Sequence, residues 1–311
     1  MKFLNAKTVI IFIISSIIVF SALVFMGDYR KVLDSLYLLR ADVIASIVIL
    51  ALANYFFRYL KWEYFLKASK IQVQKKHSLL IFLSGLSMAI TPAKVGEVLK
   101  SYYLKKLDGI KMRRSVMIIF TERLTDVLGL SILSLIGLVS FLDQAYLLVA
   151  LLVAVFVMIF ALTNERIFLR LSKFMGRLPF VNKYANSFTS IYKSCRVLMS
   201  FKSLSVTTAI SIVSWFFECL ALYVLLTSLG VNITILQATF IFSFSSIFGS
   251  VLVLPGGMGA AEGSFMVLLI LAGVSVTLAS LATIVIRIFT LFFGVLLGTI
   301  ALIITNRTAK K

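Results

Sequence analysis

Residues that carry metal or covalent chemistry are scarce in this sequence of 311 residues, which has one histidine and two cysteines. His77 lies beside Lys75 and Lys76, where we expect a solvated loop histidine. Cys195 falls in a basic segment and Cys219 in an apolar run, so neither a disulfide nor a set of metal ligands is predicted. The sequence also lacks the Gly-rich loop ending in Lys-Ser/Thr that binds nucleoside triphosphates. We therefore expect no metal, no cofactor and no direct use of ATP.

Proline and glycine are also few, with 3 and 16 residues, and they fall at a few points along the chain. A membrane β-barrel needs turns at intervals of about ten residues, with alternating hydrophobicity between them. Apolar residues, by contrast, make up 61% of the sequence, whereas a soluble globular domain has about 45–50%. A barrel and a soluble fold are both excluded, and the sequence predicts an all-α integral membrane protein.

Long apolar runs with few charges supply the expected membrane spans. A helix needs about 20 residues to cross roughly 30 Å of hydrocarbon. The first run follows Lys2 and Lys7 but lacks the small-residue cleavage site of a signal peptide, so we expect it to be retained. The sequence predicts about six full spans, at residues 8–26, 43–60, 115–141, 146–162, 204–229 and 276–304.

The net charge of +19 comes mostly from Lys and Arg in the loops. Such loops are cytoplasmic by the positive-inside rule, whereas the loops around Asp143, Gly230 and Gly273 lack both residues and are expected outside. The loop at 27–42 has balanced charges, and alternation of the spans places it outside. We expect a multi-pass protein of the cell membrane with both termini in the cytoplasm and with no nucleic-acid partner. The basic loops hold five Lys at 61–77, five Lys or Arg at 105–114 and eight at 166–202.

Two further apolar segments are each interrupted by a proline. The segment 78–104 has an arm of 13 residues before Thr91-Pro92 and a charged arm after it, and both of its ends are basic. Since neither arm can cross alone, we expect a re-entrant hairpin that enters from the cytoplasm. The segment 235–272 is broken at 255–262 and has uncharged, external ends. Its second arm is barely long enough to cross, which leaves a second re-entrant hairpin or two full crossings; we favour the hairpin.

The two halves of the chain share an order of elements: a span, a broken hairpin with a glutamate, and a span with an arginine. Glu97 precedes Arg123 by 26 residues, and Glu262 precedes Arg287 by 25. Because the hairpins enter from opposite faces, we predict an inverted-topology repeat, the plan of many secondary transporters. Within one membrane domain, 1–311, the predicted parts are a first repeat at 43–141, a cytoplasmic basic amphipathic segment at 163–203 and a second repeat at 204–305.

Charged residues inside apolar spans mark the candidate site. Such a residue costs about 2.5–3.5 kcal/mol at the centre of a membrane helix, so it usually faces a cavity or a partner. Glu122 and Asp126 are four residues apart and share a helix face, with Arg123 beside them. They form either part of a binding site or a structural ion pair. Arg287 has no local carboxylate, so its partner is a glutamate of another element or an anionic ligand.

The hairpin tips supply a second means of binding an anion. The N-terminus of a half-helix presents unpaired N–H groups and the positive end of its dipole, and glycine lets a ligand approach the backbone. Gly294 and Gly298, by contrast, have the spacing of close helix packing. Together with the charged residues, the candidate substrate-binding residues are Lys94, Gly96, Glu97, Glu122, Arg123, Asp126, Glu218, Pro255, Gly256, Gly257, Gly259, Glu262 and Arg287.

Four motifs follow one another along the chain: Thr91-Pro92-Ala93-Lys94-Val95-Gly96-Glu97, Thr121-Glu122-Arg123-Leu124-Thr125-Asp126, Leu254-Pro255-Gly256-Gly257-Met258-Gly259 with Glu262, and Arg287. With these motifs, the sequence resembles, over nearly its whole length, the flippase-like family typified by the transmembrane region of lysylphosphatidylglycerol synthase. Lys94 stands where arginine is common in that family. The soluble aminoacyl-transfer domain of the synthase is not in the sequence, so we do not expect lysyl-lipid synthesis.

The resemblance implies that the protein moves a lipid, or a lipid-linked or polyprenyl-linked intermediate, between leaflets. We expect a secondary flippase and not an enzyme, in which intramembrane arginines and half-helix N-termini hold the phosphate of an anionic lipid. Two alternatives stay open. One is a membrane-embedded enzyme whose carboxylates act on a lipid head group. The other is a scaffold that recruits a glycosyltransferase or synthetase partner through the segment 163–203.

Overall fold

The computed structural model describes residues 6–37, 39–91, 94–140, 153, 198–251, 254 and 256–309. All regular secondary structure in this part of the chain is helical, as the sequence predicted. The first half contains α1 (Ala6–Met26), α2 (Tyr29–Tyr37), α3 (Ala41–Ala68), α4 (Lys75–Leu86), η1 (Ser87–Ile90), η2 (Val95–Val98), α5 (Leu99–Asp108) and α6 (Met112–Leu138). The second half contains α10 (Phe201–Ser228), α11 (Ile235–Val251), α12 (Ala260–Leu271), α13 (Val276–Arg287), the π-helical turn η4 (Ile288–Phe292) and α14 (Phe293–Thr308).

Helices cover the predicted apolar runs that lie in the described part of the chain. The helices α3 and α10, and the continuous helix Val276–Thr308, are long and apolar enough to cross a membrane. The helix α6 has 27 residues, about 40 Å at 1.5 Å per residue, but three charged residues interrupt its apolar run. The predicted span 146–162, apart from Val153, and residues 163–197 of the basic segment lie outside the described residues.

The short helix α2 occupies the segment 27–42, for which the sequence indicated only an external loop. It follows α1 after a bend of 94°, where Asp28 adopts a left-handed conformation with a φ of 63°. Val32 is buried, whereas Tyr37 is 86% exposed, and α2 packs against α13. The loop prediction was wrong because it weighed the charges of this segment and not the helical spacing of Val32, Leu33 and Leu36.

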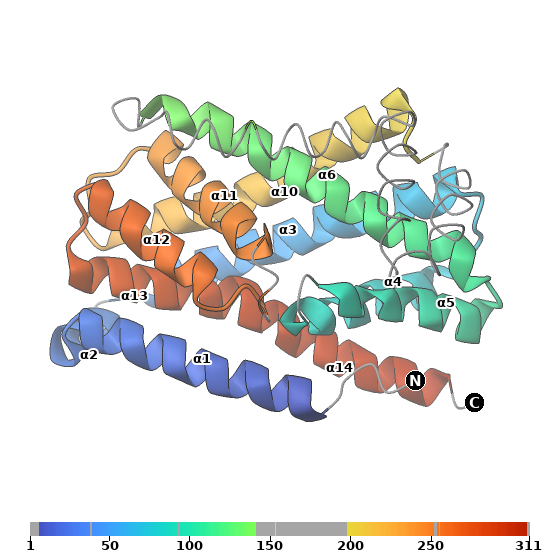
Figure 1. Ribbon diagram of the computed structural model, residues 1–311, viewed down its shortest axis with the longest axis horizontal. Helices are drawn as coiled ribbons and strands as arrows, with labels where there is room; N and C mark the ends of the chain where they lie inside the picture. The colour runs from blue at the N-terminus through green and yellow to red at the C-terminus, as the bar shows by residue number, and fades with distance from the viewer. Residues whose placement is uncertain are drawn as a thin grey trace, which may run out of the picture.

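Each proline-containing segment forms a helical hairpin, and the two hairpins approach each other from opposite ends of the bundle (Figure 1). In the first, α4 and η1 lead to the tip, and η2 and α5 lead away from it. In the second, α11 and α12 are the two arms. The helix α12 has 12 residues, about 18 Å, which is too short to cross the hydrocarbon alone. Pro92, Ala93 and Pro255 themselves lie outside the described residues.

The tips of the two hairpins meet inside the molecule. Ile90, at the end of η1, and Met258, just before α12, are both 5% exposed and belong to one apolar cluster. Leu291, Phe292 and Val295, from η4 and α14, pack against this cluster. Because the contacts come from both hairpins and from the last long helix, each tip is positioned by the other and by that helix.

At its open end the first hairpin is joined by His77 and Asp108. The Nδ1 atom of His77 lies 3.1 Å from Oδ1 of Asp108, and the two side chains are only 17% and 11% exposed. The prediction of a solvated loop histidine was therefore wrong. The partner is 31 residues away, on the opposite arm, so only the closed hairpin brings the two side chains together.

The helix α14 packs closely on the first hairpin through small residues. A Cβ atom on Gly298 would lie 2.2 Å from the backbone nitrogen of Ser87 and 2.9 Å from the carbonyl oxygen of Leu83. On Gly294, a Cβ atom would lie 2.7 Å from the hydroxyl oxygen of Tyr55. At Gly298 the two backbones can approach this closely because a side chain is absent, and at Gly294 the missing side chain leaves room for the Tyr55 ring of α3. Both glycines serve packing, as their spacing predicted.

Replacing Gly298 by alanine should destabilise the protein, because the added methyl group meets the backbone of the first hairpin. Overpacking of this kind costs about 1–3 kcal/mol, and we expect a fall of several degrees in the midpoint of thermal unfolding in detergent. Gly263→Ala in α12 is the matched control, since no atom lies within 4 Å of a Cβ there and alanine favours a helix. Equal unfolding midpoints for the two variants would contradict this packing.

Candidate functional site

A cavity of about 220 Å³ lies where the hairpin tips meet. Its wall includes Thr91, Lys94 and Glu97 from the first hairpin and Gly256 and Gly257 from the second. The rest of the wall comes mainly from α3, α4, η1, α6, α10, α11, α12 and the helix formed by α13, η4 and α14. This volume is below the roughly 300–1,000 Å³ of pockets for drug-sized ligands. The cavity therefore suits a small polar group, such as a head group, and not a whole lipid.

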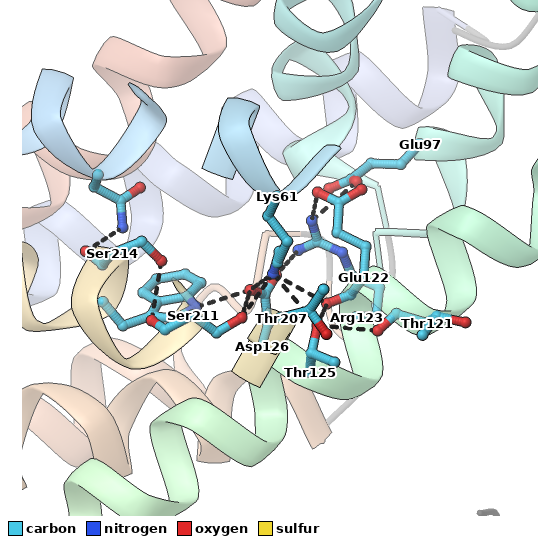
Figure 2. Close-up of polar contacts among 12 residues, drawn as sticks. Lys61, Glu97, Thr121, Glu122, Arg123, Thr125, Asp126, Thr207, Ser211 and Ser214 are labelled. Carbon is cyan, nitrogen blue, oxygen red and sulfur yellow. Dashed lines mark hydrogen bonds and ion pairs between the residues drawn. The ribbon is translucent and has the colours of Figure 1, made fainter. Parts of the chain in front are cut away.

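Asp126 of α6 is the centre of a polar cluster beside the cavity (Figure 2). Its Oδ1 atom accepts hydrogen bonds from Lys61 Nζ at 2.5 Å and from Trp215 Nε1 at 3.1 Å. Ser211 Oγ lies 3.3 Å from the same oxygen and accepts a hydrogen bond from Lys61 at 2.8 Å. The side chain of Lys61 is 0% exposed. The cluster thus joins α3, α6 and α10 through one buried ion pair.

Arg123 lies among the carboxylates of Glu97, Glu122 and Asp126 (Figure 2). Its Nη2 atom is 3.0 Å from Glu122 Oε1 and 3.1 Å from Glu97 Oε2. Its Nη1 atom is 3.2 Å from Asp126 Oδ2. Since Glu97 is in η2 and Arg123 is in α6, this contact ties the tip of the first hairpin to the helix that follows it.

Lys100 completes this network from the first turn of α5. Its Nζ atom lies 2.6 Å from Glu122 Oε2 and 3.2 Å from Glu97 Oε2, and 4.9 Å from the centre of the Trp62 ring. Lys100 and Glu97 are both 2% exposed, and Glu122 is 0% exposed. The network thus holds three cations and three carboxylates and has no net formal charge. Its members are Lys61, Lys100 and Arg123 and Glu97, Glu122 and Asp126.

Arg287 has the same kind of partner in the second half of the chain. Its Nε atom donates a hydrogen bond to Glu262 Oε1 at 2.6 Å, and its Nη2 atom donates to the carbonyl of Gly256 at 2.8 Å. The other carboxylate oxygen of Glu262 accepts the backbone N–H of Gly259 at 2.8 Å, which caps the start of α12. The distant partner that the sequence required for Arg287 is therefore Glu262, and the pair ties α13 to the second hairpin tip.

Three charged side chains in the cavity wall, Arg58, Lys94 and Glu218, take part in none of the ion pairs in the described part of the chain. Arg58 is 6% exposed and Glu218 is 5% exposed. The guanidinium of Arg58 and the ammonium of Lys94 lie 5.5 Å and 5.7 Å from the centre of the Trp215 ring. If all groups are ionised, these three give the site one net positive charge, which favours an anionic ligand.

The glycines of the tips mainly allow the tips to fold. A Cβ atom on Gly96 would lie 2.6 Å from Thr91 Cγ2, and its N–H donates a hydrogen bond to Thr91 Oγ1 at 2.9 Å. Gly257 has a φ of 70°, and a Cβ atom there would lie 2.9 Å from the carbonyl oxygen of Gly249. Gly256 also has a positive φ, of 62°, and its carbonyl is held by Arg287. These three glycines permit tight turns, and two of them, Gly256 and Gly257, line the cavity.

The predicted site residues are thus divided between the cavity and its support. Pro255 lies outside the described residues. Gly96, Glu122, Gly259 and Glu262 are not part of the cavity wall. Gly96, Glu122 and Glu262 hold residues that line it, and Gly259 binds Glu262. The predicted site residues that line the cavity are Lys94, Glu97, Arg123, Asp126, Glu218, Gly256, Gly257 and Arg287.

Sequence reasoning missed four residues of the site. Lys61 was counted among the loop lysines, which was wrong, because it lies in α3 and is fully buried. Arg58 falls inside the predicted span 43–60, so its charge was a signal that could have found it. Lys100 lies in the charged arm of the first hairpin together with Lys94 and Glu97, and its charge was a signal of the same kind. Trp215 carried no signal, since an aromatic residue in an apolar helix is ordinary.

Apart from Glu218, the carboxylates of the site named above pair with cations of the protein. In the described part of the chain, no three His, Cys, Asp or Glu side chains are arranged to hold one. Cys219 is buried, and its Sγ atom lies 3.8 Å from the carbonyl oxygen of Thr239. The cations of the cavity wall are suited to bind an anion. The predicted use of N–H groups at the tips is not supported at Gly96, Gly257 and Gly259, because these groups already donate hydrogen bonds within the tips.

Replacing Lys61 by methionine should destabilise the protein strongly, because it leaves Asp126 buried without its closest cation. Breaking a buried ion pair costs about 3–5 kcal/mol, and we expect a large fall in the midpoint of unfolding. The control is Arg40→Gln, which breaks an ion pair with Asp42 whose side chains are 77% and 63% exposed, so both charges stay solvated. If Lys61→Met unfolds at the same midpoint as Arg40→Gln, the buried network does not hold these helices together.

Comparisons with known proteins agree with this architecture. Residues 11–298 match the model of a family described as the lysylphosphatidylglycerol synthase TM region. A UPF0104 membrane protein of Methanothermobacter thermautotrophicus is 25% identical over 300 residues, which cover 88% of this chain and 87% of that protein. A UPF0104 membrane protein of Methanocaldococcus jannaschii is 22% identical over 332 residues, which cover 100% of this chain and 98% of that protein.

The match to the family covers nearly all of the sequence, including both hairpins and every residue of the site. It confirms the resemblance that the four motifs indicated. The apolar helices and these relatives together show that the chain is embedded in a membrane. The chain is therefore a membrane protein that belongs to the lysylphosphatidylglycerol synthase TM region family.

Proposed function

We propose that this protein moves an anionic lipid, or a lipid-linked intermediate, between the leaflets of the membrane. In this proposal the cavity between the hairpin tips binds the phosphate of the head group, and no covalent step takes place. The observation that carries the proposal is the charged cavity itself, which lies inside an apolar helical bundle at the point where two hairpins from opposite ends meet.

The cost of burying charge supports a functional reading of this cavity. Eight charged side chains of the described residues are at most 6% exposed. Each costs at least about 2.5–3.5 kcal/mol in a membrane helix before compensation. A bundle that needed only stability would be served as well by apolar side chains, since replacing a buried ion network by apolar residues is often neutral or stabilising. Charges of this kind in membrane proteins mark substrate and ion pathways.

The two ion pairs at the tips support an inverted repeat. Glu97 lies 3.1 Å from Arg123, and Glu262 lies 2.6 Å from Arg287. In each half, a glutamate near the start of the outgoing arm pairs with an arginine of the next helix. Such repeats are the basis of alternating access, in which one bundle rocks against the other around a central site. In this proposal, movement of each hairpin opens the cavity to one side of the membrane.

The size of the cavity fits a head group whose acyl chains stay in the lipid. At about 220 Å³, it holds a phosphate and a few more atoms and excludes the chains. Leu254 of the second hairpin lines the cavity and is 42% exposed. An exposed apolar side chain therefore lies at the edge of the cavity. In this proposal the acyl chains pass along this edge and stay in hydrocarbon while the head group moves.

The proposal is tested by lipid movement in proteoliposomes, measured with fluorescent phosphatidylglycerol and a membrane-impermeant quencher. We expect the wild-type protein to move the lipid and Glu97→Gln to move it at least tenfold more slowly. The same loss is expected for Arg287→Ala combined with Glu262→Gln, a double variant that leaves no unpaired buried carboxylate.

The matched control is Arg40→Gln, which removes a positive charge far from the cavity wall and should keep the wild-type rate. Each variant is first checked for a normal unfolding midpoint. If the folded double variant moves the lipid at the wild-type rate, the ion pair at the second hairpin tip is not needed for transport. If the stable wild-type protein moves neither phosphatidylglycerol nor any other anionic fluorescent lipid, the proposal is wrong.

A further inference from the structure

Two cations of the cavity wall form no ion pair with a carboxylate of the described residues, and both lie beside the ring of Trp215. Arg123 and Arg287 have carboxylate partners between 2.6 Å and 3.2 Å away. Lys61 and Lys100 are held in the same way. A bound anion must break those pairs before it can use these four cations. Arg58 and Lys94, which take part in no ion pair in the described part of the chain, require no such exchange.

Arg58 is a buried guanidinium with an unused donor. It is 6% exposed, and its Nε atom is buried with no hydrogen-bond partner in the described residues. A buried polar group without a partner is unfavourable, and a buried charge without a partner is more so. Its planar fork is suited to bidentate binding of a phosphate.

Lys94 is held at the cavity by a strained backbone. It has a φ of 54°, which is a left-handed backbone conformation that residues other than glycine rarely adopt. It lies between Thr91, whose carbonyl accepts its N–H at 2.9 Å, and the start of η2. Strain of this kind persists at ligand sites, where the rest of the structure imposes it. Here it turns the chain at the hairpin tip so that the lysine lines the cavity.

Trp215 of α10 brings the two cations together. Its ring centre lies 5.5 Å from the guanidinium carbon of Arg58 and 5.7 Å from the ammonium nitrogen of Lys94. Both distances are within the range of cation–π contact. The indole N–H is bound to Asp126, so the ring is fixed in place. Two like charges are thus held beside one aromatic ring, with no carboxylate of the described residues paired to either.

We propose that Arg58 and Lys94 form a phosphate-binding subsite, with the Trp215 ring as its floor. The ligand is a phosphate monoester or diester, whose negative charge compensates the two cations and whose oxygens accept their N–H groups. This inference rests on the proposed function, because it assigns the head-group phosphate to these residues. Arg123 and Arg287 then act as positioning residues that fix the hairpin tips. A subsite of Arg58 and Trp215 was not indicated by the sequence motifs.

Glu218 allows a test in which two substitutions change phosphate affinity in opposite directions. It is three residues after Trp215 in α10 and lines the same cavity. A bound phosphate and an ionised Glu218 repel each other, so removing this carboxylate should tighten phosphate binding. Removing a cation of the subsite should weaken it. If Arg58, Lys94 and Glu218 had only structural roles, their removal would not change phosphate affinity in opposite directions.

The test is equilibrium binding followed by tryptophan fluorescence of the full chain in dodecyl maltoside, a detergent without phosphate. The chain has two tryptophans, and Trp215→Phe shows which part of the signal comes from the subsite. The probes are inorganic phosphate, glycerol 1-phosphate and dihexanoyl phosphatidic acid. We expect a saturable change that is lost in Trp215→Phe. Arg58→Gln and Lys94→Gln should each weaken binding at least tenfold, whereas Glu218→Gln should strengthen it several-fold.

The control is Arg40→Gln, which should bind like the wild-type protein, and all variants must unfold at a normal midpoint. Arg58→Lys guards against misfolding of Arg58→Gln, because it keeps the charge but loses the fork and should bind with intermediate affinity. Wild-type binding by both Arg58→Gln and Lys94→Gln, or no saturable signal with any probe, would overturn the subsite. Binding of the short lipid alone or of all three probes supports it, and the preference shows whether the ligand is lipid-borne.

The two proposals fail separately. Lipid movement in proteoliposomes together with unchanged phosphate binding in the subsite variants would reject the subsite and keep the transport function. Phosphate binding with the expected pattern, but without lipid movement, would keep the subsite and reject transport.

Discussion

Charge compensation in an interior with little water is the constraint on which the rest of this structure depends. A buried ion without a partner costs several kcal/mol, and the partners of these ions come from different helices. Lys61 in α3, Asp126 in α6 and Ser211 in α10 can satisfy one another only in a single arrangement of the three helices. The network therefore fixes the shape of the cavity as well as lining it. A ligand that changes the balance of charge in the cavity acts on helix positions through these same contacts.

In the proposed mechanism, this constraint also explains how binding leads to movement. The two hairpin tips are held to the following helices by the pairs Glu97–Arg123 and Glu262–Arg287. An anion beside Arg58 and Lys94 supplies the charge that this side of the cavity lacks. The arriving phosphate also attracts Arg123 and Arg287 and so weakens their hold on the glutamates. Neutral side chains at these positions would pack as well but would not respond to a charged head group.

Much of the fold and part of the site could be predicted from the sequence, for physical reasons. Long apolar runs directly indicate helices that face hydrocarbon. Proline and glycine indicate where such a helix breaks, so both hairpins were predicted. Arg287 has no carboxylate on its own helix, and this alone required a distant partner. Spacing along one helix does not reveal its neighbours, however, so the contact of Lys61 with Asp126 was missed. Trp215 was missed because an aromatic residue in an apolar helix carries no signal. Arg58 was missed although its charge inside a predicted span could have found it, and α2 was missed because its charges hid its helical spacing.

The most direct test of the central claim is the accessibility of the cavity from each side of the membrane. Ser246 lines the cavity, so Ser246→Cys in a background with Cys195→Ser and Cys219→Ser places one thiol there. A membrane-impermeant thiol reagent is added to one side of oriented vesicles at a time. Alternating access predicts labelling from both sides, with an anionic lipid present changing the ratio of the two rates. Labelling from one side only, with or without lipid, would contradict a cavity that carries a head group across the membrane.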